Sequence, residues 1–210
     1  MTIPQLSGDQ PRRAYVYVPQ SYGEDPERRY PVMYFFDGQN IFFDDDAAFG
    51  TSWGMEGYML ESERELILVA IECNREGSGR LEEYSPFTFE NSELGRIKGR
   101  GKQYMHWLIK ELKPYIDETY RTLPDRENTM IAGSSMGGLM ALYAATTFNS
   151  VFQRAACLSP SLWVAPGKIL ELIARAHIRR DTCIYLDYGA KEMFNHAANA
   201  EALFSTAHLL

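Results

Sequence analysis

Cysteine is scarce in this chain: three residues in 210, at Cys73, Cys157 and Cys183. Their odd number and wide spacing fit neither a disulfide framework nor a zinc site. Each stands in an apolar run, so we expect buried free thiols. Because nothing in the sequence depends on disulfides, we expect a cytoplasmic protein.

Long apolar runs and an excess of basic residues are also absent. No stretch of about 18 apolar residues occurs, so no membrane span is expected, and the polar residues 1–10 do not form a signal peptide. The 28 acidic residues outnumber the 21 basic ones, for a formal net charge of −7. Nucleic acid needs a basic face, so we exclude it as a partner.

What the sequence does contain is an alternation of strand and helix patterns. Apolar runs that predict strands lie at residues 13–19, 30–36, 66–73, 128–133, 155–158 and 182–188, the first at a sheet edge. Helical patterns lie at residues 101–120, 138–147, 168–178 and 197–210. Continuous apolar runs are typical of strands buried on both faces. We therefore predict one α/β domain over residues 1–210, with a mainly parallel central sheet and helices on both faces.

Two local features depart from this alternation. Pro114 falls inside the helical pattern of residues 101–120, so we expect a kink or a break there. Residues 74–95 are polar, contain Gly77, Gly79 and Pro86, and fit neither period. Because this segment directly follows a strand, it should leave the sheet at its carboxyl edge, where α/β proteins bind ligands. A long loop at that edge is more often functional than incidental.

The segment from Gly133 to Gly137 matches G-x-S-x-G, with Ser135 at its centre. An apolar strand precedes the motif and a helix-forming stretch follows it, which is the setting of a nucleophile elbow. Such a turn lifts the serine Oγ out of the sheet, and the small flanking residues let strand and helix approach. It also puts the amide of Met136 at a helix N-terminus, where an oxyanion is stabilised.

An esterase built on this turn needs a second amide donor and an acid. The run that ends at Asp37 is followed by a glycine that lets the backbone turn, so the amide of Gly38 or of Gln39 is the candidate donor. The acid should follow a later strand. Glu192 stands in the loop beyond residues 182–188 and is favoured over Asp187, which we expect inside the strand.

Such a serine needs a histidine as its base. The chain contains four histidines. His106 and His177 precede the acid in helical patterns, and His196 and His208 follow it too closely for the usual position after one more strand. His196, in a loop, is a substitute candidate for the missing base. We expect the chain to lack the C-terminal strand, histidine loop and last helix of this fold.

The motifs together resemble the putative-esterase family of α/β-hydrolases, which includes siderophore trilactone esterases, feruloyl and acetylxylan esterases, S-formylglutathione hydrolase and mycolyl transferases. The resembling segments are YFFDGQN, RLEEYSP, LKPYIDETYRT, IAGSSMGGL, SPSLW and YLDYGAKE. The resemblance implies that Ser135 is the nucleophile and Glu192 the acid. It also implies that the loop with Arg80, Glu83 and Tyr84 borders the substrate pocket and that Trp163 forms a pocket wall. Arg80 either binds an anionic substrate or pairs with Glu83.

These observations favour hydrolysis of a small-molecule carboxylic ester through an acyl-Ser135 intermediate. Acyl transfer to another acceptor and a non-catalytic binding module are the alternatives. The mechanism needs no metal or organic cofactor, and residues 44–46, three aspartates, are expected to be a solvated loop rather than a calcium site. A homo-oligomer is compatible with the sequence.

Overall fold

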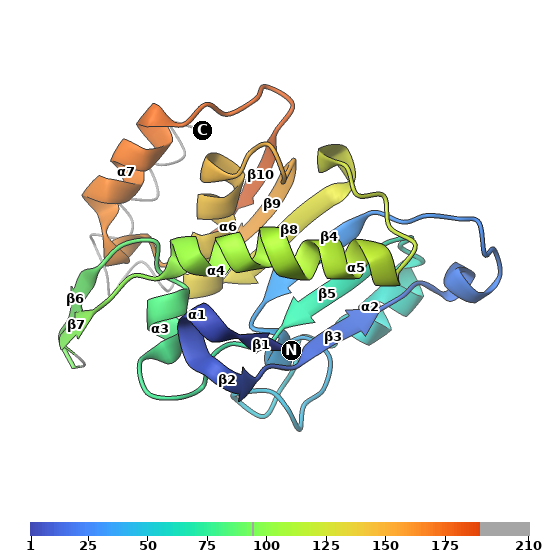
Figure 1. Ribbon diagram of the computed structural model, residues 1–210, viewed down its shortest axis with the longest axis horizontal. Helices are drawn as coiled ribbons and strands as arrows, with labels where there is room; N and C mark the ends of the chain where they lie inside the picture. Colours follow the sequence, from blue (N-terminus) through green and yellow to red (C-terminus); the bar gives the residue numbers. More distant parts are fainter. Residues whose placement is uncertain (94, 190–210) are drawn as a thin grey trace.

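The computed structural model describes residues 1–93 and 95–189, and their centre is a six-stranded sheet (Figure 1). The strand order is β10-β9-β8-β4-β5-β3. All neighbours are parallel except β3, which runs antiparallel to β5 at the edge. The strands are β3 Ala14–Tyr17, β4 Val32–Phe36, β5 Ile67–Ile71, β8 Thr129–Ser134, β9 Arg154–Leu158 and β10 Cys183–Leu186. Each coincides with one of the six predicted apolar runs.

Helices and two small hairpins complete the described residues. The α-helices are α1 Pro4–Ser7, α2 Met55–Ser62, α3 Gly79–Glu83, α4 Gly101–Trp107, α5 Lys113–Thr119, α6 Met136–Thr147 and α7 Pro166–Arg175. The 3-10 turns are η1 Gln20–Gly23, η2 Gly38–Asn40, η4 Arg126–Asn128 and η5 Leu162–Val164. The hairpins pair β1 Thr2–Ile3 with β2 Gly8–Pro11, and β6 Phe89–Asn91 with β7 Gly95–Ile97. The helix predicted at residues 197–210 lies outside the described residues.

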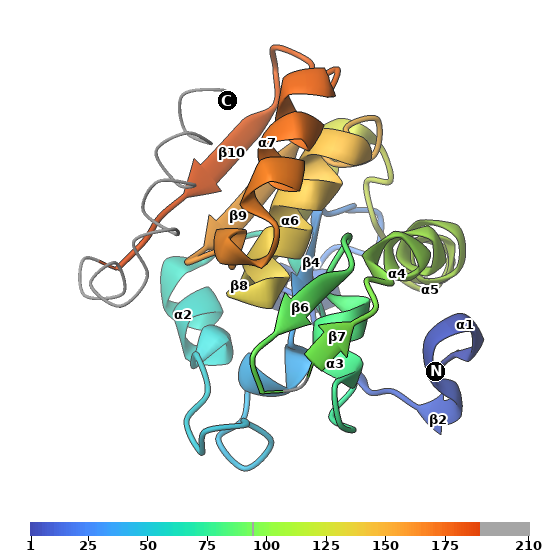
Figure 2. The ribbon, with the colours of Figure 1, turned by 90° about the vertical axis from the view of Figure 1, so that its left-hand side faces the viewer.

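The central sheet is covered by helices on both faces. Alternate residues of a strand point to opposite faces, and in β4 this sends Tyr34 and Phe36 into the larger core and Phe35 into a smaller one. The larger core is shared with α4 and α6, and the smaller one includes Met55 of α2. Figure 2 shows α2 on one side of the sheet and α4, α5 and α6 on the other. The central strands β4, β5 and β8 are therefore largely buried on both faces, which explains their continuous apolar sequences.

The helix predicted at residues 101–120 forms, but with a wider turn in its middle. The π-helical segment Leu108–Leu112 joins α4 to α5, and Pro114 stands in the first turn of α5. Proline has no N–H and its ring crowds the carbonyl four residues earlier. The wider turn comes where that crowding would occur, so the helix continues past Pro114 without a break.

Two expectations are corrected by the fold. The segment at residues 74–95 is not an irregular loop, because it contains α3 and β6 and closes onto β7. Cys73 and Cys157 are buried free thiols as predicted, but Cys183 is exposed. The reason is that Cys183 begins β10, the last strand of the described sheet. In residues 1–93 and 95–189, no helix has the length and apolarity needed to cross a membrane.

Candidate functional site

Ser135 stands at the turn between β8 and α6, in the middle of the sheet. Its backbone has φ 55° and ψ −119°, a left-handed φ that is strained for serine. The residue is exposed, although the strand before it and the helix after it are largely buried. The hydroxyl is therefore presented to solvent at the carboxyl edge of the parallel strands.

The flanking glycines allow this turn because a Cβ would fit at neither position. On Gly133 a Cβ would lie 2.6 Å from the carbonyl carbon of Gly137, and on Gly137 it would lie 2.9 Å from Cβ of Phe36. Helix α6 therefore packs directly onto β8 and the end of β4. The amide of Met136 opens this helix of 12 residues, and the first N–H groups of a helix have no intrahelical acceptor. The Met136 amide is thus suited to bind an oxyanion.

The turn after β4 brings the second candidate donors to the same edge. Asp37 adopts a left-handed conformation with φ 57°, and η2 begins at Gly38. A Cβ on Gly38 would lie 2.4 Å from the carbonyl carbon of Ala70, so only glycine fits there. A Cβ on Gly137 would lie 3.3 Å from Oδ2 of Asp37, which places this turn against the start of α6. The amides of Gly38 and Gln39 remain the two candidates.

An ion pair fixes the conformation of the turn after β4. Arg80 of α3 donates from Nε and an Nη atom to the two oxygens of Asp37, at 2.7 and 2.8 Å. The expected pair between Arg80 and Glu83 is therefore wrong; Glu83 instead pairs with Arg12 at 2.8 Å in the interior. Arg80 keeps 31% of its side chain exposed. A bidentate pair with a nearly buried carboxylate holds the turn in one geometry.

Of the two aromatic residues expected near the substrate, Tyr84 is buried and Trp163 is exposed. Tyr84 is fully buried, and its hydroxyl accepts a hydrogen bond from the Asp37 amide at 3.1 Å. The expected substrate contact of Tyr84 is thus corrected: its ring packs in the core and its hydroxyl supports the Asp37 turn. Trp163 of η5 is 37% exposed and meets Phe89 edge-on, with ring centroids 6.1 Å apart. The role of Trp163 as a pocket wall stays a prediction.

The thiol nearest to this turn is not a competing nucleophile. The side chain of Gln39 accepts a hydrogen bond from the Cys73 amide at 3.1 Å and donates to Cys73 Sγ at 3.3 Å. Burial, together with the charge of Asp37, raises the pKa of Cys73 to about 12. Since the thiolate is the reactive form, Cys73 stays inert near neutral pH.

Of the two candidate acids, only Asp187 lies among the described residues. Strand β10 ends at Leu186, so Asp187 follows the strand, contrary to the expectation that it lies inside it. Its carboxylate accepts hydrogen bonds from the Ser159 amide at 2.9 Å and the Tyr185 hydroxyl at 3.1 Å. Asp187 thus braces the loop after β9. Glu192 lies outside the described residues.

The two described histidines are remote from Ser135. His106 packs edge-on against Phe148, at the C-terminal end of α6. His177 lines a surface pocket with Thr146 and Thr147, at the same end of that helix. Ser135 precedes the opposite end, so neither side chain can take its proton. His196 and His208 lie outside the described residues.

Sequence reasoning missed one residue that contacts Ser135. The Oγ of Ser161 lies 3.2 Å from the Oγ of Ser135, and the amide of Ser161 donates to the Ser135 carbonyl at 3.0 Å. Ser161 is 4% exposed. Ser161 belongs to the SPSLW segment that resembles the family, but a contact between two serines 26 residues apart cannot be read from spacing alone.

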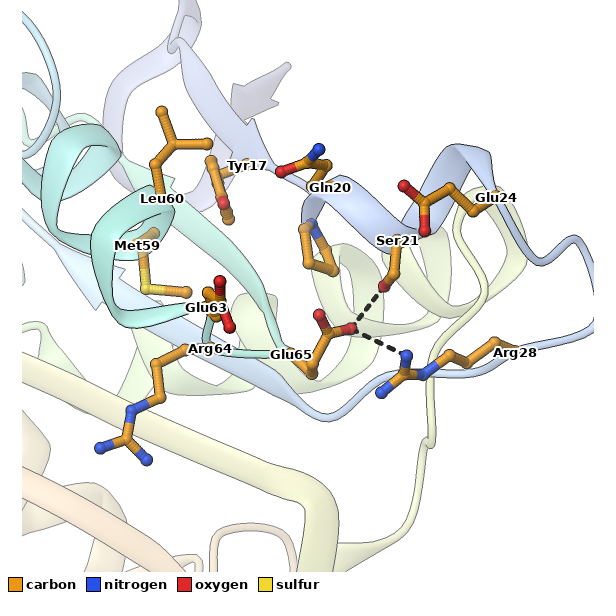
Figure 3. A pocket seen from close by; sticks show the side chains of 11 residues that line it. Tyr17, Gln20, Ser21, Glu24, Arg28, Met59, Leu60, Glu63, Arg64 and Glu65 are labelled. Atoms are coloured by element: carbon orange, nitrogen blue, oxygen red, sulfur yellow. Dashed lines mark hydrogen bonds and ion pairs between the residues drawn. The ribbon is translucent and has the colours of Figure 1, made fainter.

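A cavity of about 350 Å³ lies elsewhere on the molecule (Figure 3). It is lined in part by Arg28 and Glu65, which form an ion pair at 3.2 Å, and by Ser21, which donates a hydrogen bond to Glu65. Arg28 and Glu65 precede β4 and β5, so this cavity opens at the amino edge of the sheet. It is therefore separate from the site at Ser135.

The chain matches the family model described as "Putative esterase" over residues 7–208. The YbbA protein of Bacillus subtilis is 25% identical over 184 residues, which cover 86% of this chain and 69% of that protein. The match with the family model extends through all the candidate residues, including those that the structure does not describe.

Solved structures agree on the fold. An IroE-like serine hydrolase from Shewanella oneidensis superposes with a TM-score of 0.69 at 20% identity, over 93% of this chain and 65% of that one. The enterobactin esterase of Shigella flexneri gives a TM-score of 0.67 at 21% identity, over 94% of this chain and 47% of that one. The sheet and its helices thus form an α/β-hydrolase fold. The chain spans about two thirds of the length of the serine hydrolase and about half of the length of the enterobactin esterase.

Proposed function

We propose that this chain, which belongs to the "Putative esterase" family, hydrolyses carboxylic esters through an acyl intermediate on Ser135. The observation that carries the proposal is the strained, exposed turn that raises Ser135 between β8 and α6. A serine in that setting attacks a carbonyl carbon while nearby amides bind the developing oxyanion.

The chain's residues divide the chemistry among them. Ser135 Oγ forms the bond to the carbonyl carbon and gives its proton to a general base. The amides of Met136 and of Gly38 or Gln39 stabilise the negative oxygen. Glu192, or in its place Asp187, orients the base. No histidine of residues 1–93 or 95–189 contacts Ser135, so neither His106 nor His177 is the base.

The substrate that we propose is a small-molecule ester. Trp163 is exposed, and Arg80, paired with Asp37 beside the turn after β4, keeps 31% of its side chain exposed. These two side chains offer an aromatic wall and a positive charge to a bound acyl or alcohol group. The enterobactin esterase structure was determined in the presence of 2,3-dihydroxy-N-benzoyl-serine.

Covalent labelling tests the proposal. A fluorophosphonate probe should label the chain once, on the peptide that contains Ser135, because the activated serine attacks phosphorus as it attacks a carbonyl. Labelling should disappear on denaturation and in Ser135→Ala. A folded chain that stays unlabelled would instead indicate a binding module. If labelling succeeds but alcohol acceptors receive the acyl group in preference to water, the activity is acyl transfer.

A further inference from the structure

Ser161 has a buried hydroxyl that makes its hydrogen bond with the candidate nucleophile. Ser161 is 4% exposed, and its Oγ lies 3.2 Å from Ser135 Oγ. Within the part of the chain that the structure describes, this is the hydroxyl's one hydrogen bond. Buried hydroxyls almost always have a partner, and here the partner is the reacting atom.

The ordinary structural role of a serine at this position is not realised. Ser161 is the residue before the 3-10 turn η5, where a serine side chain commonly caps the free amides. Its hydroxyl makes no capping hydrogen bond. Its amide donates to the Ser135 carbonyl at 3.0 Å, and the Ser135 amide donates to the Leu158 carbonyl at 2.9 Å. The loop after β9 is therefore fixed against Ser135 through the backbone, independently of the hydroxyl.

We infer that Ser161 is a further catalytic residue, whose hydroxyl donates to Ser135 Oγ during acylation and deacylation. This rests on the proposed function. Ser135 must give its own proton to the general base, so it cannot also donate to Ser161. The hydrogen bond therefore runs from Ser161 to Ser135 when the base is engaged.

Both chemical steps place negative charge on Ser135 Oγ. In acylation, the proton of Ser135 goes to the base, Oγ bonds to the carbonyl carbon, and the π electrons move to the carbonyl oxygen. The carbonyl then re-forms as the C–O bond to the alcohol breaks, and the base gives its proton to the leaving oxygen. In deacylation, water adds to that carbon, giving a proton to the base; the C–Oγ bond then breaks, and its electron pair stays on Oγ, which recovers the proton. Hydrogen bonds from hydroxyl to charged oxygen shorten to about 2.5–2.7 Å, so the bond at 3.2 Å can tighten as the charge develops.

The test compares Ser161→Ala and Ser161→Thr with the wild-type chain. We expect Ser161→Ala to lower the fluorophosphonate labelling rate and kcat for p-nitrophenyl acetate by about 10- to 100-fold, the worth of a hydrogen bond to a charged group. KM should change little, since the bond strengthens in the transition state. Ser161→Thr keeps the donor and should retain most of the wild-type rate.

Thr146→Val is the matched control, because it removes another buried hydroxyl from the far end of α6. Thr146 Oγ1 donates to the Leu142 carbonyl at 2.9 Å. This variant should lower the unfolding midpoint in urea without slowing labelling. Wild-type labelling rates in folded Ser161→Ala, or equal losses in the alanine and threonine variants, would overturn the role of Ser161. A wild-type chain that fails to label would overturn the proposed function itself.

Discussion

With a general base serving Ser135, Ser135→Ala is expected to lower the turnover of p-nitrophenyl acetate by about 10⁶-fold, the loss found when the nucleophile of a serine protease of another fold is removed. Without the hydroxyl no acyl intermediate forms, and only binding and the oxyanion amides remain to accelerate direct attack by water. The measurement is the initial rate of p-nitrophenol release at saturating ester.

Ser134→Ala is the matched control for this loss. Ser134 is the neighbouring serine at the end of β8, and its hydroxyl makes no hydrogen bond within residues 1–93 and 95–189. The control should keep a turnover close to that of the wild-type chain. A Ser135→Ala chain that hydrolyses the ester at the wild-type rate would show that another group carries the chemistry.

Arg12→Met is expected to lower the free energy of unfolding by about 3–5 kcal/mol at neutral pH. Arg12 donates to both oxygens of Glu83, at 3.0 and 2.8 Å, and the two side chains are 4% and 2% exposed. Removing the guanidinium leaves a buried carboxylate without its charge partner. Because Glu83 shares the short helix α3 with Arg80, the loss also weakens the support of the Asp37 turn.

The stability lost in Arg12→Met should depend on pH. Burial raises the pKa of Glu83, against the opposing effect of Arg12, and the pKa rises further when Arg12 is absent. A carboxyl whose pKa is higher in the folded than in the unfolded chain favours folding below that pKa, and this contribution is lost as pH rises through it. The cost of Arg12→Met should therefore shrink from pH 7 to pH 5, as measured by urea unfolding.

Two further variants separate the buried charge from general damage. Arg12→Met combined with Glu83→Leu removes both charges and should recover most of the stability. Arg175→Met breaks the exposed pair with Glu171, whose side chains are 79% and 54% exposed, and should cost no more than about 1 kcal/mol. Equal losses at both pH values, or no recovery in the double variant, would count against this interpretation of Glu83.

The strands and the turn at Ser135 could be predicted because their signals are local. Continuous apolar runs mark β4, β5 and β8, since parallel strands are buried on both faces. The G-x-S-x-G spacing follows from contacts between adjacent elements: Gly133 and Gly137 touch one another across the turn. Neither inference requires knowledge of distant contacts.

The pairings around the site could not be predicted because they join distant segments. Arg80 meets Asp37 across 43 residues, and Arg12 meets Glu83 across 71. Sequence spacing favoured the neighbour Glu83 for Arg80, but α3 points Arg80 toward the turn after β4. Burial of Tyr84 likewise depends on how α3 and α4 pack, since its ring meets those of Phe36 and Tyr104.

The most direct measurement of the central claim is mass spectrometry of the chain quenched in acid during turnover of p-nitrophenyl acetate. If Ser135 is the nucleophile, one acetyl group should be found on the peptide containing Ser135, and it should be absent from Ser135→Ala. Acetyl found on another residue, or turnover with no acetylated chain at any quench time, would contradict the acyl-Ser135 mechanism.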